Sequence, residues 1–311
     1  MPYIGDSTLY LDPSSKTLSV FDNTGKIARV MALPHPEDAG AFAGSWSLGS
    51  PQLDAKGRLI YRGSAPTKFA MVGGKVRTPY QVDSAPLVRV DLESRKTDTI
   101  AQLRVLNATK YSLAEDENRV TTFTIVINPF QKVDQWAMAS DGSIAIVRAS
   151  DYRVDWIRSN DARQVGEKMP YDWVRLTDSV KQFKLDSMRR SLPANSTFGK
   201  PIDVTIPTEG GPLKAKQVST WVPASEVPDY ESSIAFNAVL ADHSGHIWIL
   251  PRNRSGAGNG LIYDVVNQDG KVVDQVRLPP DRALAGFGID GSIYLTRVEK
   301  GAAFLERTKL K

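Results

Sequence analysis

The sequence has no cysteine and only three histidines, His35, His243 and His246. The absence of cysteine excludes disulfide bonds, thiolate metal ligands and a cysteine nucleophile. His243 and His246 follow an aspartate in a turn, and imidazole and carboxylate groups are ligands that zinc accepts. However, His246 occupies the position that Arg58 has in a related turn, so we interpret it as a solvated turn residue. The sequence therefore predicts no metal site, no cofactor and no catalytic residue.

Long apolar runs and blocks of like charge are also missing. No stretch of about 18 apolar residues occurs, which predicts that the chain does not span a membrane. The first residues do not combine basic residues with an apolar stretch, so we expect no signal peptide in this chain. The net charge is +4, but no run of five like charges occurs. We therefore expect no nucleic-acid partner.

A tight turn followed by an apolar strand recurs along the chain. In each copy, aspartate and glycine supply the backbone conformations that hairpin turns require, and β-branched or aromatic residues then form a strand. Most copies are followed by another apolar strand, which makes a meander of three or four strands per unit. Four copies occupy residues 54–61, 140–147, 242–249 and 290–295, and a looser copy occupies residues 5–11.

The spacing of these copies predicts an all-β fold of the β-propeller class. The turn glycines are 52, 85, 103 and 46 residues apart; they are Gly5, Gly57, Gly142, Gly245 and Gly291. These intervals are close to one or two propeller blades of about 40 to 50 residues. Five to seven blades fit, with six favoured, in a single domain over residues 1–311. We expect strands from both ends of the chain to pair and close the ring, because closure removes exposed strand edges.

Two stretches interrupt the repeat. Residues 104–132 contain an acidic loop and an apolar strand, which we assign to an irregular blade. Residues 171–233 are predicted to form an irregular, partly helical insertion. Within it, Thr177 or Asp178 caps a helix that Pro193 ends. The apolar residues of that helix recur at roughly helical spacing and are Val180, Phe183, Met188 and Leu192.

Aromatic residues in the repeats and in the insertion have different expected roles. Those in strand patterns, such as Trp136 and Trp248, are expected to pack between blades. The insertion combines large apolar groups and arginines that have no evident sheet to cover, which predicts a partner-binding surface. Its predicted partner-binding residues are Tyr171, Trp173, Phe183, Met188, Arg189, Arg190 and Trp221. The alternative is that the helix covers one face of the propeller.

Three segments carry a resemblance to a known family. Residues 83–91, 134–156 and 284–307 resemble uncharacterised six-bladed propellers that Gram-negative soil bacteria export. The resemblance covers the repeats and leaves out residues 171–233. It implies a periplasmic or other extracytoplasmic location at the periphery of a membrane. The chain is also similar to the extrinsic propeller-like subunit of a double-ring photosynthetic reaction-centre complex, which implies a membrane protein complex as the partner.

Two functions from different classes remain open at this point. The first is a non-catalytic interaction or structural subunit, a rigid propeller that docks onto a larger assembly through its loops and residues 171–233. The second is a metal-dependent hydrolase or lactonase similar to gluconolactonases, with a metal ion held by carboxylates and amides in the central channel. A fold alone does not decide between them, and that family's ligands do not map onto this chain residue by residue.

Overall fold

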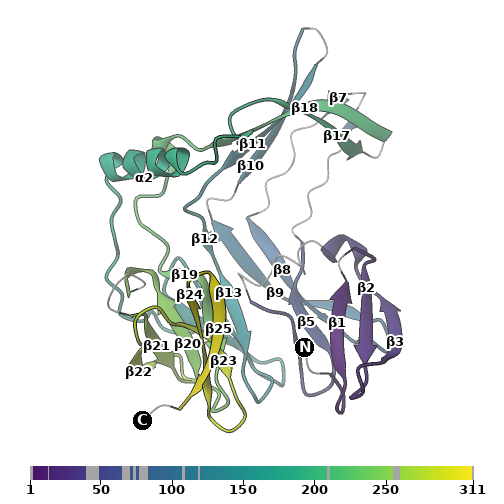
Figure 1. Ribbon diagram of the computed structural model, residues 1–311, viewed down its shortest axis with the longest axis vertical. Coiled ribbons are helices and arrows are strands. Elements are labelled where there is room, and N and C mark those ends of the chain that lie inside the picture. The colour runs from purple at the N-terminus through teal and green to yellow at the C-terminus, as the bar shows by residue number, and fades with distance from the viewer. Residues whose placement is uncertain are drawn as a thin grey trace.

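The computed structural model describes residues 3–12, 14–39, 49–64, 71–72, 75–76, 83–106, 109–117, 120–208, 211–254 and 260–309. Figure 1 shows a body of several sheets and, above it, a projecting unit that contains a sheet and one helix. Both ends of the chain lie at the body. Within these ranges no helix is long and apolar enough to cross a membrane.

The body contains five antiparallel sheets that follow one another along the chain. The first has the strands β1 (Thr8–Asp12), β2 (Thr17–Phe21) and β3 (Ile27–Ala32). The second has the order β12-β9-β8-β5-β4 and contains β4 (Gln52–Leu53), β5 (Leu59–Arg62), β8 (Ser84–Val90), β9 (Thr97–Leu106) and β12 (Lys132–Val133). The third contains β13 (Gln135–Met138), β14 (Ile144–Arg148), β15 (Arg153–Ile157) and β16 (Arg163–Gln164).

The last two sheets of the body continue this pattern. The fourth contains β19 (Ile234–Ala241), β20 (Ile247–Pro251), β21 (Ile262–Val266) and β22 (Val272–Arg277). The fifth contains β23 (Ala283–Phe287), β24 (Ile293–Glu299) and β25 (Ala302–Thr308). Shorter elements are the hairpin of β6 (Met71–Val72) with β7 (Lys75–Val76) and the 3-10 turns η1 (Pro36–Asp38), η3 (Ala224–Glu226) and η4 (Arg252–Arg254).

The recurring turns form hairpin corners of these sheets, as the sequence predicts. The side chain of Asp54 accepts hydrogen bonds from the backbone N–H groups two and four residues later, at 2.9 Å each, and Asp242 does the same. Gly142 (φ 81°) and Gly245 (φ 82°) have backbone conformations at these corners that favour glycine. The four copies join the first two strands of the second, third, fourth and fifth sheets.

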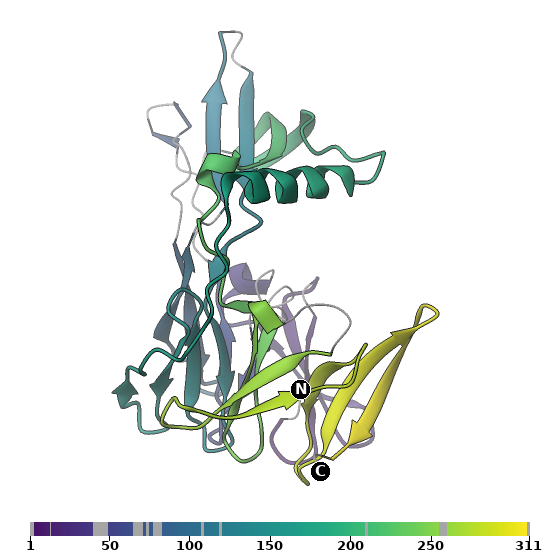
Figure 2. The same ribbon diagram turned by 90° about the vertical axis from the view of Figure 1, so that its left-hand side faces the viewer.

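Hydrophobic clusters join each sheet to the next one in the chain. Leu18 and Tyr61 belong to the cluster between the first and second sheets, and Leu103 and Trp136 to the one between the second and third. One larger cluster joins the third, fourth and fifth sheets, which fan out across the lower part of Figure 2. The strand aromatics with at most 2% exposure are Tyr61, Trp136, Trp156, Trp248 and Tyr263.

Consecutive meander sheets that pack on one another in chain order are the arrangement of a β-propeller. The predicted all-β propeller class is therefore confirmed. The described residues place five such sheets in the body, within the predicted range of five to seven but one fewer than the favoured six.

The predicted pairing between the two ends of the chain is wrong for the strands that the structure describes. β1, β2 and β3 form a sheet of their own, and β23, β24 and β25 form another. In Figure 1 the purple N-terminal sheet and the yellow C-terminal sheet lie apart. Each end sheet pairs its strands through its own hairpins and packs on its neighbour in the chain, so its core does not depend on a strand from the other end.

The projecting unit combines both stretches that interrupt the repeat. Its sheet has the order β10-β11-β18-β17, with β10 (Lys110–Glu115), β11 (Thr121–Ile127), β17 (Ile202–Thr208) and β18 (Gly211–Trp221). β11 and β18 run parallel and pair from Thr122 with Lys216 to Ile127 with Trp221. The assignment of residues 104–132 to an irregular blade is therefore wrong, because the hairpin within that stretch leaves the body and pairs with β18.

The helix α2 (Asp178–Arg190) starts where the sequence predicts. The hydroxyl group of Thr177 accepts a hydrogen bond from the backbone N–H three residues later, at 3.4 Å, which is an N-cap. Of the apolar residues that recur along this helix, Phe183 is 66% exposed, whereas Lys181 and Leu185 are buried. Lys181 can be buried because its methylene groups pack while its ammonium group reaches Asp229 at 2.6 Å.

Candidate functional site

Charged side chains gather where the second and third sheets meet. Asp134, only 1% exposed, accepts hydrogen bonds from Arg148 Nη1 at 2.6 Å and from Arg104 Nε at 3.2 Å. Arg148 also donates to Asp155 at 2.6 Å, and Arg104 donates to Asp151 at 3.1 Å. Buried charges are costly unless they are paired. Each carboxylate in the network is paired with an arginine. The network also holds in place the turn that carries Asp151.

The arginines of this network keep two carboxyl groups ionised. Burial opposes the ionisation of Asp155, but hydrogen bonds from Arg148 and Arg153 outweigh it and hold its pKa below the usual value. Burial likewise opposes the ionisation of Asp151, and the hydrogen bond and charge of Arg104 again lower the pKa on balance. Both groups are therefore charged at neutral pH, which suits ion pairing rather than proton transfer.

A groove of about 470 Å³ opens beside this network, at the foot of the projecting unit. The rings of Tyr152, Tyr171 and Trp173 form a ladder with centroid separations of 4.9 and 4.8 Å. Lys132 Nζ lies 5.6 Å from the centre of the Trp173 ring, and Lys168 also lines the groove. Aromatic surface and positive charge thus stand side by side in one concave surface, which is the composition of a binding site.

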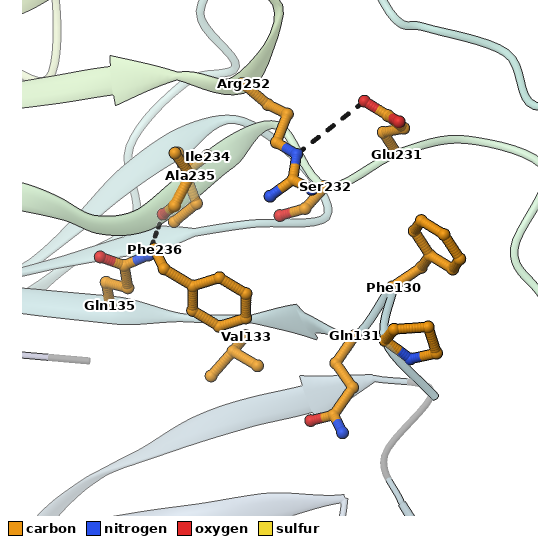
Figure 3. A pocket seen from close by; sticks show the side chains of 11 residues that line it. Phe130, Gln131, Val133, Gln135, Glu231, Ser232, Ile234, Ala235, Phe236 and Arg252 are labelled. Atoms are coloured by element: carbon orange, nitrogen blue, oxygen red, sulfur yellow. Dashed lines mark hydrogen bonds and ion pairs between the residues drawn. The ribbon is translucent and has the colours of Figure 1, made fainter. Parts of the chain in front are cut away.

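A second hollow lies where the connecting segments meet the body (Figure 3). Its volume is about 10 Å³, roughly the space that a single water needs. Gln135 donates to the backbone oxygen of Ala235 at 2.5 Å, and Glu231 lies 3.9 Å from Arg252 Nε and 2.8 Å from Lys184 Nζ. These contacts tie the third sheet, the fourth sheet and α2 together, so the hollow is a packed joint rather than a ligand site.

Five of the seven predicted partner-binding residues lie at two accessible places. Tyr171 and Trp173 line the groove at the foot of the projecting unit. Phe183, Arg189 and Arg190 are exposed on α2. The structure therefore does not bring the five together into one patch, and each place needs its own interpretation.

The other two, Met188 and Trp221, pack inside the projecting unit. Both join the cluster around Leu185, and the ring of Trp221 lies 4.5 Å from that of Phe198. This packing resembles the covering role that we gave as the alternative, although α2 covers the end of the unit's own sheet rather than a face of the propeller.

Sequence reasoning did not single out Lys132, Lys168 or Tyr230, which also line the groove. Lys132 belongs to the first interrupting stretch, Lys168 follows the third sheet, and Tyr230 lies in the segment that returns to the body. No repeat or spacing signals that these positions meet, because the meeting depends on how both excursions leave the body.

The turn that contains two histidines has a structural role. Asp242 accepts a hydrogen bond from His246 N at 2.9 Å, lies 3.3 Å from His246 Nδ1 and accepts another bond from Trp248 Nε1 at 3.0 Å. Among the residues that the structure describes, no group of three or more His, Asp or Glu side chains is placed to hold a metal ion.

The fold and these sites define an all-β propeller that carries a projecting unit of sheet and helix. Neither a protein-family model nor a curated protein matches the chain. Among solved structures the chain is similar to virginiamycin B lyase from Staphylococcus aureus, with 8% identity over 100% of this chain and 83% of that one and a TM-score of 0.36. It is also similar to a gluconolactonase from Xanthomonas campestris (9% identity, 94% and 79% covered, TM-score 0.28). A third is TolB from Acinetobacter baumannii (11% identity, 98% and 62% covered, TM-score 0.31). Identities this low carry no information about activity.

Proposed function

We propose that the protein is a non-catalytic subunit that binds a protein partner through the projecting unit, with the outer surface of α2 as the contact. The observation that carries this proposal is Phe183, a large apolar side chain that is 66% exposed. Val180, 37% exposed, and Arg190 lie three and seven residues away and therefore on the same helix face. Aromatic residues and arginine are enriched at the centres of protein interfaces.

The inner side of α2 indicates that the exposure of Phe183 does not come from a loosely attached helix. Leu185 is fully buried in the cluster at the end of the unit's sheet. The ammonium group of Lys181 is 2.6 Å from Asp229. A helix that is held on one side presents Phe183 in a defined position, which reduces the entropy lost on binding.

The charge at the C-terminal end of α2 indicates the chemistry of the partner. Arg189 lies 2.7 Å from Asp186. Its neighbour Arg190 forms no ion pair within the described ranges. An apolar socket for Phe183 that is bordered by carboxylates would match this surface, because complementary charge steers association and sets its specificity.

We further propose an extracytoplasmic setting at the periphery of a membrane, with a membrane protein complex as the partner. The support is the resemblance of residues 83–91, 134–156 and 284–307 to exported propellers, and the particular assembly that it indicates is a photosynthetic reaction-centre complex. Cell fractionation tests this setting. We expect the protein outside the cytoplasm, in a membrane-associated fraction from which high salt releases it, and a purely cytoplasmic protein would contradict the proposal.

The partner surface is tested by combining Phe183→Ser with Arg190→Ser in the full chain. Neither side chain is buried, so we expect an unchanged melting temperature. Quantitative affinity purification should recover the partner at a level lower by about ten-fold or more, since interface hot spots contribute more than 1 kcal/mol each. Leu305→Ser is the matched control, because Leu305 is also 66% exposed but lies in β25 of the body. Undiminished recovery with the double variant, or an equal loss with the control, would contradict the proposal.

A further inference from the structure

We propose that the groove at the foot of the projecting unit binds a small planar carboxylate, with the anionic group on Lys132 and the flat apolar part against Trp173. This site is separate from the partner surface on α2 and goes beyond it. The groove measures about 470 Å³, within the roughly 300–1,000 Å³ of small-molecule sites. Figure 1 shows that β12, which begins with Lys132, lies where the body meets the unit.

The aromatic wall of the groove is held in place from behind. Trp173 is 38% exposed, and its ring meets the ring of Tyr171 edge-on at 4.8 Å. Tyr171 in turn packs at 4.9 Å on Tyr152, which is fully buried. Tyr230, 43% exposed, adds a further ring to the lining. A preorganised aromatic surface of this kind binds flat apolar groups at a low entropic cost.

Lys132 supplies a cation that is not paired with a carboxylate in the part of the chain that the structure describes. Burial lowers the pKa of its ammonium group, although the charge of Asp151 acts in the opposite direction. Within the described ranges no carboxylate oxygen lies within 4.0 Å of Lys132 Nζ, and its close contact is the Trp173 ring at 5.6 Å. Pairing with an incoming carboxylate releases more free energy for a partly desolvated, unpaired cation than for a fully hydrated one.

The carboxylate that lines the groove is already shared among several cations. Asp151 lies 3.1 Å from Arg104 Nη2, 3.3 Å from Arg153 Nη1 and 3.8 Å from Lys168 Nζ. Arg104 also pairs with Asp134, and Arg153 with Asp155, so the excess of positive charge around the groove comes from Lys168 and Lys132. A bound anion therefore meets a net attraction that a neutral molecule of the same shape does not.

The test compares two ligands that share a ring and differ in charge. Isothermal titration calorimetry of the full chain is carried out with indole-3-acetate and with indole-3-acetamide. We expect the acid to bind about ten-fold more tightly than the amide, which corresponds to about 1.4 kcal/mol. Added salt should reduce the preference, because it screens the charge.

Variants of Lys132 assign the preference to that side chain. Lys132→Met keeps most of the side-chain length and removes the charge, so it should abolish the preference for the acid, whereas Lys132→Arg should retain it. Trp173→Leu should lower the affinity for both ligands. Lys271→Met is the matched control, because Lys271 is exposed in the β21–β22 turn and its loss should change neither affinity. Thermal melting of each variant establishes that it is folded.

Three results would overturn the proposal. These are equal affinities for the acid and the amide, an unchanged preference in folded Lys132→Met, and no detectable binding of the acid at millimolar concentration. The variant that combines Phe183→Ser with Arg190→Ser should bind indole-3-acetate as the natural sequence does. The experiments can therefore contradict the proposal for the groove without contradicting the proposal for the partner surface, and the reverse.

Discussion

The hydroxyl group of Tyr152 donates a hydrogen bond to the carboxylate of Asp264, and this contact joins the third sheet of the body to the fourth. Both residues are at most 1% exposed. The same carboxylate pairs with Arg254 and accepts a bond from Gln275 at 2.9 Å. Burial, followed by the charge of Asp264, raises the pKa of the Tyr152 hydroxyl group, so it remains a hydrogen-bond donor. The interface between these two sheets thus contains a hydrogen-bonded polar group inside an apolar cluster. We call the bond between Tyr152 and Asp264 the clamp.

Replacing Tyr152 by phenylalanine tests the clamp. We expect Tyr152→Phe to lower the free energy of unfolding by about 1–3 kcal/mol, because it leaves a buried acceptor with one partner fewer. Urea denaturation measures the change. Tyr10→Phe is the matched control, since Tyr10 is 55% exposed, and its effect should stay within about 0.5 kcal/mol. Equal effects of the two substitutions would show that the bond to Asp264 is not what stabilises the interface.

The ion-pair network around Arg148 should make stability depend on acid pH. The folded-state pKa of Asp155 lies below its unfolded value of about 3.9, so the unfolded chain binds more protons at low pH. This contribution is complete above about pH 5 and is lost as the pH falls through the folded-state pKa.

Arg148→Met should weaken that dependence. It leaves Asp134 and Asp155 with fewer cationic partners, so we expect a loss of about 3–5 kcal/mol at neutral pH and a shallower decline of stability in acid. Denaturation curves between about pH 7 and pH 3 measure both effects. An acid decline as steep as that of the natural sequence would show that Arg148 does not hold the carboxyl group of Asp155 ionised. Arg190→Met, on the exposed side of α2, is the control and should leave the profile unchanged.

Gly166 lies close to the backbone of β15. A Cβ atom at this position would lie 2.1 Å from the backbone oxygen of Val154, and backbone cannot yield as the end of a flexible side chain does. We expect Gly166→Ala to lower the free energy of unfolding by about 1–3 kcal/mol through overpacking. At Gly286 a Cβ atom would meet nothing within 4 Å, so Gly286→Ala is the matched control. If thermal melting gave the two variants the same midpoint, the close approach would be refuted.

Leu185 and Phe183 lie on opposite sides of α2 and should respond differently to truncation. Leu185→Ala removes a fully buried side chain and should cost about 2–5 kcal/mol of local stability. Hydrogen exchange should then increase over residues 178–190, while the third, fourth and fifth sheets keep their protection. Phe183→Ala should leave exchange unchanged. A uniform increase over the whole chain after Leu185→Ala would show that the unit and the body unfold together.

The turns and the buried aromatics could be predicted because their signals are local. Gly142 and Gly245 follow aspartates at the start of apolar strands, and this chemistry specifies a hairpin whatever surrounds it. Trp136 and Trp248 stand in apolar strand patterns, which predicted that they pack between sheets. The helix start at Thr177 was recognisable for the same reason.

The projecting unit and its groove could not be predicted because their contacts are distant in sequence. The parallel pairing of Thr122 with Lys216 joins two excursions that look unrelated. Lys181 is buried on α2 because its ammonium group pairs with Asp229. The helical pattern does not predict this contact, since Asp229 lies outside the helix. Lys132 and Trp173 meet only because both excursions leave the body at the same place.

The pairing of β11 with β18 also sets an order of events during synthesis. β18 emerges about 90 residues after β11, so at about 5–20 residues per second the hairpin of β10 and β11 waits roughly 5–20 s for its neighbour. During that interval the edge of β11 has unpaired backbone groups beside the apolar side chains of Phe123 and Ile125. An unpaired apolar edge invites pairing with another chain. The nascent protein is therefore exposed to this pairing from the time β11 leaves the ribosome until residue 221 does so.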